Sequence, residues 1–370
     1  MRTIKDQHPK TKKMSSKTYK EKINIMKANC PMPQLDFDII TLGHGSGGLL
    51  TSKLLDSGVF NLLENEYLNE KHDGAVFELV GKTAMTTDSF VISPVFFPGG
   101  NIGELAVNGT VNDLAMCGAI PKHISLGLIL EEGLKMEELW DILLSVRFAC
   151  EKAGVQVVTG DTKVVEKGKG DKVFINTTGI GQVHENANIH IDRIKVGDKI
   201  LVSGQIATHG IGIMSVREGL EFETDIESDT TCLNHTVKKL LDQFGENIHL
   251  LRDPTRGGLG TVLTEMAQQA GLGMDILQKN IPLDEQVEGA CEMLGLDPLY
   301  VANEGVFVAI VSDEVHEAAL ESLKQDENGI NAACIGEVTE NHKGQVILKS
   351  AIGGKRVIHK LPGEQLPRIC

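Results

Sequence analysis

The hydrophobic and polar residues of the first half alternate between the spacing of a strand and the spacing of a helix. Over residues 122–130 the apolar side chains of Ile124, Leu126, Leu128 and Leu130 occupy every second position, which is typical of a strand with one buried face. Over residues 136–153 apolar positions recur at helical spacing, and Gly154 follows, where glycine is a preferred helix C-cap. The next apolar run, over residues 155–158, predicts a strand that enters a turn at Gly160.

The second half repeats this alternation after a polar turn near Val196. VGDKILVSG predicts a new strand, RDPTRGG predicts a turn that opens a helix over residues 258–270, and residues 306–311 predict a further strand. We therefore predict a mixed α/β (α+β) chain with one domain at 37–192 and another at 193–360. A length of 370 residues supports two domains, because a single hydrophobic core rarely organises so long a chain.

The two ends of the chain lack this periodicity. Residues 1–36 are rich in lysine but contain no apolar core segment, so they fit neither a signal peptide nor a membrane anchor. We expect a disordered basic leader there. Residues 361–370 contain two prolines and a glycine, which predicts a mobile tail that ends in Cys370.

Charge, cysteine spacing and the length of the apolar runs exclude several classes of protein. A formal net charge of -15 argues against a nucleic-acid partner, because such proteins gather positive charge on one face. The sequence contains no apolar run of eighteen residues, so we expect no membrane span. The seven cysteines form no CxxC pair, which favours reduced thiols and a cytoplasmic protein.

A glycine-rich segment, GHGSGG at residues 43–48, follows the apolar, strand-like stretch 37–42. Its backbone N–H groups would be accessible to phosphate oxygens, with Gly45, Ser46, Gly47 and Gly48 as the candidate ligands. The spacing matches neither GxxxxGK[ST] nor GxGxxG, so a flexible turn is an equally good interpretation.

Acidic residues at loops or element edges of the first half are candidate magnesium ligands. They are Asp73, Asp88, Asp113 and Asp161. Magnesium prefers oxygen ligands and usually shares them with substrate phosphates. Each aspartate taken alone is also explained as a turn or capping residue.

The stretch from Glu104 to Gly118 has a polar stripe at helical spacing. Glu104, Asn108 and Asn112 share this stripe, which predicts that Asn112 and Asp113 face out of the core. The stripe would contact a ligand or would simply be solvated.

The segment RDPTRGG combines basic residues with a helix start. Asp253 and Arg256 lie there beside backbone N–H groups that favour anions such as phosphate or carboxylate. A cap with surface salt bridges is the alternative.

Taken in order, the segments GHGSGG, TTDSF, FFPGGNIGELAVNGTVNDLAMCGA, TGDTKVV, RDPTRGG, ANEG and PRIC resemble the HypE family of carbamoyl dehydratases. The resemblance runs from about Leu42 to Cys370. Aminoimidazole ribonucleotide synthetase, selenophosphate synthetase and thiamine-monophosphate kinase share the Asp-rich loops, whereas the PRIC ending is specific to this branch.

The resemblance implies a two-domain aminoimidazole ribonucleotide synthetase-like fold. It implies a homodimer whose N-terminal sheets pair into a barrel, a C-terminal α/β sandwich, a flexible tail, and ATP bound with Mg2+. It also implies a reaction in which the carbamoyltransferase HypF loads a carbamoyl group onto Cys370. ATP-dependent dehydration then gives a thiocyanate, whose cyanide goes to iron held by HypC and HypD for a nickel-iron hydrogenase.

The resemblance also implies roles for the candidate residues. Cys370 carries the substrate, Lys163 neutralises phosphate charge or orients the carboxamide, and Glu304 is the candidate base. The nucleotide would contact Gly45, Ser46, Gly47, Gly48, Thr87, Asn112, Asp253 and Arg256. The metal would contact Asp73, Asp88, Asp113 and Asp161. His72 precedes Asp73 where the family commonly has a second acidic residue, so the number of metal ions stays open.

Two other functions stay open. A small-molecule kinase or synthetase would keep the ATP site, but the reactive residue of a selenophosphate synthetase lies in the glycine-rich loop, which here has His44 and Ser46. A maturation scaffold without turnover would use the tail only for binding.

Overall fold

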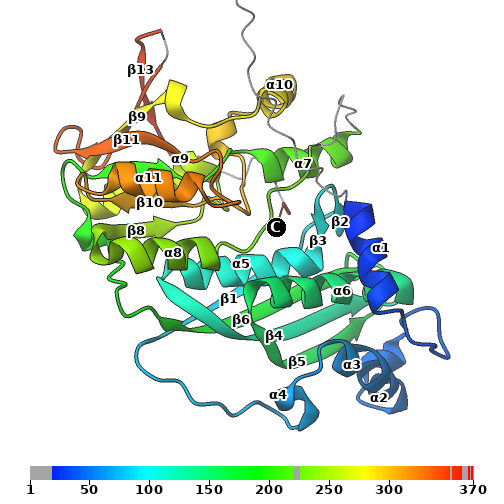
Figure 1. Cartoon of the computed structure of the whole chain (residues 1–370). Helices are drawn as coiled ribbons and strands as arrows, with labels where there is room; N and C mark the ends of the chain where they lie inside the picture. Colours follow the sequence, from blue (N-terminus) through cyan, green and yellow to red (C-terminus); the bar gives the residue numbers. More distant parts are fainter. Residues whose placement is uncertain (1–18, 220–225, 351, 361–365, 367, 370) are drawn as a thin grey trace, which may run out of the picture.

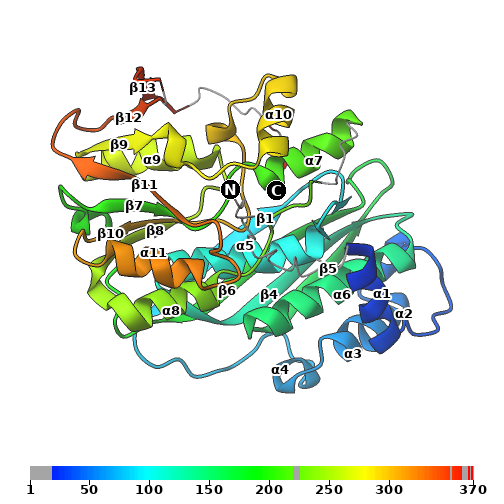
Figure 2. The ribbon, with the colours of Figure 1, turned by 45° about the horizontal axis from the view of Figure 1, so that its top comes forward.

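Two β-sheets with helices packed against them form the body of the protein (Figures 1 and 2). The computed structural model describes residues 19–219, 226–350, 352–360, 366 and 368–369. Residues 1–18 of the predicted leader, and Cys370, lie outside these residues. Within them, no helix combines the length and the apolar character needed to cross a bilayer.

The first sheet contains four strands in the order β1-β6-β4-β5. They are β1 (Thr83–Phe90), β6 (Val173–Val183), β4 (Ala119–Glu131) and β5 (Gln156–Val165). β4 and β5 are parallel, and the other neighbours are antiparallel. Helices α5 (Ile102–Met116) and α6 (Met136–Ala153) pack on one face (Figure 1). β1 and β5 are therefore the opposite edges of this sheet.

The remaining elements of the first half are short. They are α1 (Tyr19–Asn29), η1 (Leu42–Gly45), α2 (Leu49–Leu54), η2 (Leu55–Val59), α3 (Phe60–Leu62), α4 (Glu66–Asn69), β2 (Phe96–Phe97) and β3 (Gly100–Asn101). The strand expected over residues 37–42 is wrong, because only an isolated bridge from Ile39 to Lys135 forms there. The turn expected at Gly160 is also wrong, because β5 continues to Val165. A Cβ at Gly160 would lie 2.4 Å from the Leu126 carbonyl oxygen, so glycine permits close strand pairing there.

The second sheet contains seven strands in the order β13-β12-β9-β11-β7-β10-β8. Its strands are β7 (Lys199–Val202), β8 (Ile248–Arg252), β9 (Gly273–Leu277), β10 (Val308–Val311), β11 (Ala333–Thr339), β12 (Val346–Lys349) and β13 (Lys355–Ile358). Helices α8 (Asn234–Phe244) and α11 (His316–Lys324) share a buried cluster with one face. Helices α7 (Thr208–Glu218), α9 (Gly258–Ala270) and α10 (Glu285–Leu294) share a cluster with the other face. Short turns are η3 (Ile191–Arg193), η4 (Gly245–Asn247), η5 (Gln278–Asn280) and η6 (Pro298–Tyr300).

Helix α5 contacts the first sheet on one side and α8 and β8 on the other. Its polar stripe is therefore buried, with Glu104, Asn108 and Asn112 exposed by 6%, 2% and 2%. The prediction that Asn112 faces out of the core is wrong, because a segment of the second half covers it. Asn108 donates to the Thr230 hydroxyl at 3.3 Å, and Asn112 donates to the Thr231 carbonyl at 2.9 Å. The stripe joins the two halves of the chain.

Candidate functional site

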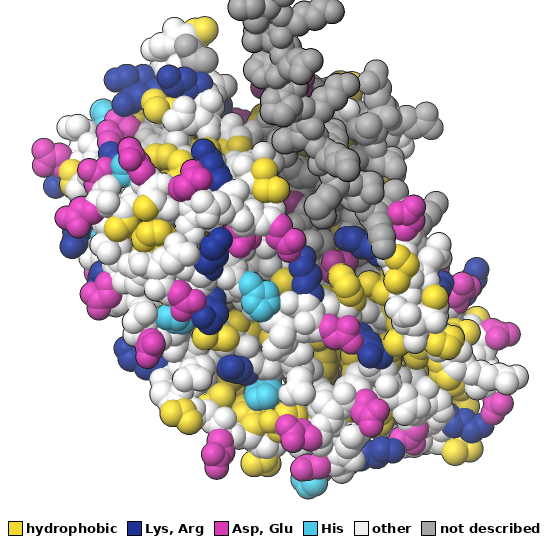
Figure 3. All heavy atoms as spheres, viewed as in Figure 1, with side chains coloured by type: hydrophobic (Ala, Val, Ile, Leu, Met, Phe, Trp, Pro, Cys, Tyr) yellow, Lys and Arg dark blue, Asp and Glu magenta, His cyan; other side chains and the backbone are white. Residues whose placement is uncertain are grey.

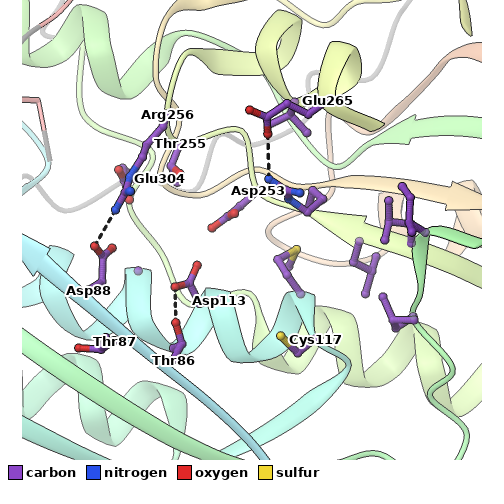
Figure 4. Close-up of a pocket in the computed structure, with 18 of the residues that line it drawn as sticks. Thr86, Thr87, Asp88, Asp113, Cys117, Asp253, Thr255, Arg256, Glu265 and Glu304 are labelled. Carbon is purple, nitrogen blue, oxygen red and sulfur yellow. Dashed lines mark hydrogen bonds and ion pairs between the residues drawn. The ribbon is translucent and has the colours of Figure 1, made fainter. Parts of the chain in front are cut away.

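A cleft of about 850 Å³ opens between β1, α5 and the turn before α9. Acidic side chains from five segments line it, namely Asp88 on β1, Asp113 on α5, Asp253 after β8, Glu265 on α9, and Glu304 before β10 (Figure 4). We refer to this cavity as the acidic cleft. Residues far apart in the sequence meet here because α5 packs between the two sheets.

Two hydrogen bonds position the carboxyl groups at the mouth of the cleft. Arg256 contacts Asp88 at 3.0 Å, and the Thr86 hydroxyl donates to Asp113 at 2.8 Å (Figure 4). The turn after Arg256 requires glycine, since Gly257 and Gly258 have φ angles of +72° and +64°. This turn leaves the Arg256 side chain 79% exposed, so it is accessible to an anion.

Burial disfavours ionisation of the carboxyl groups inside the cleft. Burial, and then the neighbouring Asp113, raises the pKa of Asp253 to about 7. Burial also raises the pKa of Asp113, and it raises the pKa of Glu304 well above its ordinary value. One oxygen of Glu304, Oε1, has no hydrogen-bond partner among the described residues. The cleft thus concentrates acidic groups that a cation would stabilise.

The donor set fits a magnesium ion that shares its ligands with a phosphate. In the described part of the chain, no group of three or more His, Cys, Asp or Glu residues is arranged to hold a metal ion. Magnesium commonly takes one or two carboxylates together with phosphate oxygens and water. Asp88 and Asp113 are the two predicted ligands that line the same cleft.

A second cavity, of about 180 Å³, lies at the β5 edge of the first sheet. Gly45, Gly47, Asp161 and Lys163 line it, and we refer to it as the edge cavity. The Lys163 ammonium lies 2.5 and 2.7 Å from the two carboxylate oxygens of Asp161. This hydrogen bond lowers the pKa of Asp161, and both side chains are exposed. A Cβ at Gly45 would lie 2.4 Å from the Val164 nitrogen, so the loop reaches β5 only with glycine there.

The rest of the glycine-rich loop leads into α2. The Ser46 hydroxyl donates to the Gly43 carbonyl at 3.0 Å, and Gly48 is the residue before the helix. Leu49 then begins α2 with its side chain 73% exposed. Figure 3 shows apolar side chains gathered at the right of the face in view, beside α1 and α2.

Of the other predicted ligands, Thr87 lines the acidic cleft, whereas Asp73 and Asn112 line neither cavity. Asp73 is exposed in the loop before β1 and lines neither cavity. The Thr87 hydroxyl donates to the Thr177 carbonyl at 3.0 Å on β6. Asn112 uses its amide on backbone groups, including the Leu233 N–H at 2.8 Å. Contact of Thr87 and Asn112 with a nucleotide stays a prediction.

The predicted site residues that line a cavity therefore fall into two groups, one at each edge of the first sheet. Two strands, β6 and β4, separate β1 from β5. At about 4.8 Å between neighbouring strands, the two edges are about 14 Å apart. Asp88 lies on one edge strand and Asp161 on the other, so a single sheet does not bring them together.

The described residues of the C-terminal tail contact the body of the protein. The Arg368 guanidinium donates to the Val91 carbonyl at 3.0 and 3.1 Å, pairs with Asp171, and lies 5.9 Å above the Phe174 ring. Ile369 is 6% exposed and belongs to a buried cluster of the first half. These contacts are with residues on β6, before β6 and after β1.

His209 on α7 binds the backbone of the last described residue. Its Nε2 lies 2.9 Å from the Ile369 carbonyl oxygen, and its Nδ1 lies 2.7 Å from the Ser228 hydroxyl. A carbonyl only accepts, so Nε2 carries the proton and Nδ1 accepts from Ser228. Burial lowers the pKa of His209 to about 4, which keeps the ring neutral at pH 7.

His209, Asp171 and Asp229 are contact residues of the tail or of Glu304 that were not predicted from the sequence. Each is one polar residue of an ordinary type, with no motif that marks it. Their importance comes from contacts with segments far away in the sequence, which strand order and domain packing determine. The Ser-Asp-Thr segment at 228–230 was the only local signal, because such residues favour backbone hydrogen bonds.

Two family models match this chain. The model of the N-terminal domain of AIR synthase related protein matches residues 71–183, and that of the C-terminal domain matches residues 195–349. The matched ranges contain the strands of the two sheets, apart from β13 at the end of the second.

Relatives match over nearly their whole length. Carbamoyl dehydratase HypE of Azotobacter vinelandii is 50% identical over 332 residues, which are 90% of this chain and 97% of the relative. A crystal structure of hydrogenase maturation protein HypE in complex with ATP is similar with a TM-score of 0.86 and 46% identity, covering 89% and 99% of the two chains. A HypE–HypF complex contains a chain with a TM-score of 0.74 and 44% identity, covering 85% and 100%.

Proposed function

The chain belongs to the HypE carbamoyl dehydratase family, and we propose that it dehydrates a carbamoyl group on the Cys370 thiol to a thiocyanate, with ATP as second substrate. The name carbamoyl dehydratase of its relatives supports the reaction class. The product would supply the cyanide ligand of iron in a nickel-iron hydrogenase. The iron would be held by a HypC–HypD complex.

The proposed reaction balances without any further reactant. The carboxamide oxygen attacks the γ-phosphorus, and ADP leaves with the bond electrons. A base removes one N–H proton as the carbon–nitrogen double bond forms. Loss of the second N–H proton and expulsion of phosphate then give the nitrile. In sum, thiocarbamate and ATP give thiocyanate, ADP, phosphate and one proton.

Glu304 is the residue that we propose as the base. Its side chain is buried, burial raises its pKa well above its ordinary value, and Oε1 has no partner among the residues described. A base works best when its pKa is close to the working pH. The acidic cleft thus provides a suitable proton acceptor.

The contact of Ile369 with the body carries the proposal. Cys370 is the next residue in the chain. His209 binds the Ile369 carbonyl, and the adjacent Gly210 N–H donates at 3.1 Å to the carbonyl of Ala302, two residues before Glu304. A substrate tethered to Cys370 would need only a short path to the acidic cleft. This juxtaposition favours chemistry on the tail over phosphorylation of a free small molecule.

Asp88 and Asp113 would hold magnesium, and Arg256 would neutralise phosphate charge in the acidic cleft. Bound MgATP would supply the phosphoryl group. Asp253 would lie beside the phosphates with its proton partly retained near pH 7. The protein would then contribute positioning and charge neutralisation, which dominate phosphoryl transfer.

We propose that two copies of the chain pair through their N-terminal sheets. Lys163 and Asp161 lie at the sheet edge opposite Asp88, and a second copy is able to bring its edge cavity to the acidic cleft of the first. Met85 and Ile129, which are 68% and 44% exposed, offer apolar surface on the strands of this sheet. The contact of a relative with HypF supports a carbamoyltransferase as another partner. Reaction at a free thiol also favours the reducing cytoplasm.

The test is a mass measurement on the C-terminal peptide. The protein is incubated with carbamoyl phosphate, the carbamoyltransferase and MgATP, with Cys370→Ala as the control. We expect a cyano group in place of the thiol hydrogen on the peptide that holds Cys370, and no change in the control. An unmodified peptide in the presence of an active transferase would contradict the proposal and favour a kinase or a scaffold.

A further inference from the structure

The backbone around Glu304 is fixed by buried side chains of other segments. Asn303 accepts from the Ala207 N–H at 2.6 Å and donates to the Pro254 carbonyl at 3.0 Å. Asn112 donates to the Glu304 carbonyl at 3.2 Å. These hydrogen bonds restrain the backbone that carries the proposed base, and proton transfer depends on the position of the base.

Asp229 accepts hydrogen bonds from backbone N–H groups at and after Glu304. Its Oδ1 accepts from the Glu304 N–H at 3.0 Å, and the Gly305 N–H also donates to this carboxyl group. A Cβ at Gly305 would lie 1.8 Å from the Asp229 carbonyl oxygen. The two segments are therefore in direct contact, and only glycine fits at position 305.

The burial of Asp229 is unfavourable for stability. Its Oδ2 is buried and has no hydrogen-bond partner among the residues described, and burial raises its pKa to about 6. An unpaired buried carboxyl group costs free energy that an apolar residue would not. A role other than stability would explain its presence.

The neighbours of Asp229 contact the tail and the central helix. Ser228 hydrogen-bonds His209, which in turn binds the Ile369 carbonyl. Thr230 accepts from Asn108 on α5. Three consecutive residues thus contact α5, the proposed base and, through His209, the tail.

We propose that Asp229 is a positioning residue, which fixes the Glu304 backbone and, through its neighbour Ser228, sets the base relative to the substrate on the tail. This inference rests on the proposed function. Asp229 itself does not touch the substrate and exchanges no proton with it. Its contribution is the geometry of Glu304.

Two substitutions separate positioning from charge. Asp229→Ala removes the acceptor for both N–H groups, and we expect thiocyanate formation in a single turnover to slow about 100-fold. Asp229→Asn keeps a carbonyl oxygen as acceptor, and we expect a rate close to that of the unmodified protein. ATP affinity, measured by calorimetry, should be unchanged in both. Asp198→Asn is the matched control, since Asp198 is buried, accepts from the Lys195 N–H at 2.7 Å, and lines neither cavity.

Asp229→Asn also tests the inference if the alanine variant does not fold. Thermal unfolding shows whether each variant is folded, and the positioning role requires a folded Asp229→Asn variant with a rate close to that of the unmodified protein.

The outcomes distinguish this inference from the proposed function. A normal rate in a folded Asp229→Ala variant, or a loss in Asp229→Asn as large as that expected of Asp229→Ala, would overturn the positioning role. Absence of a cyano product from the unmodified protein would overturn the proposed function, and the inference with it.

Discussion

The acidic cleft and the edge cavity both contain aspartates near a basic side chain, but their carboxyl groups ionise differently. In the cleft, burial raises the pKa of Asp113, and it raises that of Asp253 to about 7. In the edge cavity, the hydrogen bond from Lys163 lowers the pKa of Asp161. In the acidic cleft the aspartates would be stabilised by a bound cation. In the edge cavity Asp161 already forms an exposed ion pair with Lys163. Burial, more than sequence, decides between the two roles.

Removal of the proposed base from the cleft should have the largest effect on the rate of thiocyanate formation. Glu304→Gln keeps the size of the side chain but removes the proton acceptor, so thiocyanate formation should slow about 10²–10⁴-fold. ATP affinity should be retained. Rapid-quench mass spectrometry of the C-terminal peptide measures the rate, and a rate within threefold of the unmodified protein would remove Glu304 from the mechanism.

Mixed dimers test whether the two cavities belong to one site. We expect Glu304→Gln and Lys163→Ala to be slow alone, each by about 100-fold or more. In a mixed dimer, one site would combine an intact cleft with an intact edge cavity from the other chain. Co-purified mixed dimers, carrying two different affinity tags, should therefore regain activity. If the mixed dimers do not regain activity, the acidic cleft of one chain does not share a site with the edge cavity of the other chain.

Substitutions of Asp253 and Asp161 should affect stability with opposite signs. The pKa of Asp253 is raised in the fold, so its ionisation costs stability that grows as the pH rises from about 4 to above 7. Asp253→Asn should therefore stabilise the protein at pH 8 by about 1–3 kcal/mol and have no such effect at pH 4. The pKa of Asp161 is lowered and its side chain is exposed, so Asp161→Asn should destabilise by less than about 1 kcal/mol at pH 8. Thermal unfolding without nucleotide at both pH values measures this, and equal shifts would contradict the comparison.

Arg256 should contribute to nucleotide binding more than to stability. Its contact with Asp88 is largely exposed, so Arg256→Ala should change the unfolding free energy by less than about 1 kcal/mol. Loss of a charge-assisted hydrogen bond to phosphate should weaken ATP binding about tenfold. Lys238→Ala, which removes another exposed ion pair, is the control. Calorimetric titration with MgATP measures the affinity of each variant. Equal affinities of Arg256→Ala and Lys238→Ala would contradict a role of Arg256 in nucleotide binding.

The smallest expected effect concerns the tail. Asp171→Asn removes one contact of Arg368, whose side chain is 43% exposed. Surface ion pairs are worth about 0.2–1 kcal/mol, so the rate of alkylation at Cys370 should rise by at most about fivefold. The control Glu337→Gln breaks the pair with Lys199 and should leave this rate unchanged. A slower alkylation in Asp171→Asn would contradict a stabilising contact.

The long helices were predictable from the sequence because many apolar residues in each segment recur at the same helical spacing. The helices expected over 136–153 and 258–270 are confirmed, and Gly154 has the left-handed φ of +72° expected of its cap. Gly160 was misread because glycine favours turns, whereas here it allows a close strand pair. That requirement comes from Leu126, which lies far away in the sequence.

The types of residue in the candidate site were predictable from the sequence, but which of these residues lie together was not. Asp88, Asp113, Asp253, Arg256 and Glu304 all line the acidic cleft. The sequence does not reveal that β1 and β5 are opposite edges, so Asp161 and Lys163 were assigned to the same site. Asn112 was expected to face out of the core because the covering segment is distant in the sequence. The roles of these residues stay predictions.

Contacts of Arg368 and Ile369 with the body have a kinetic consequence. A substrate attached to the same chain reaches the cleft at an effective concentration set by the tail, whatever the concentration of protein. Dehydration would then be independent of dilution, whereas loading by a separate transferase would slow as the proteins are diluted. In a dilute cell, the supply of carbamoyl groups would limit the overall flux.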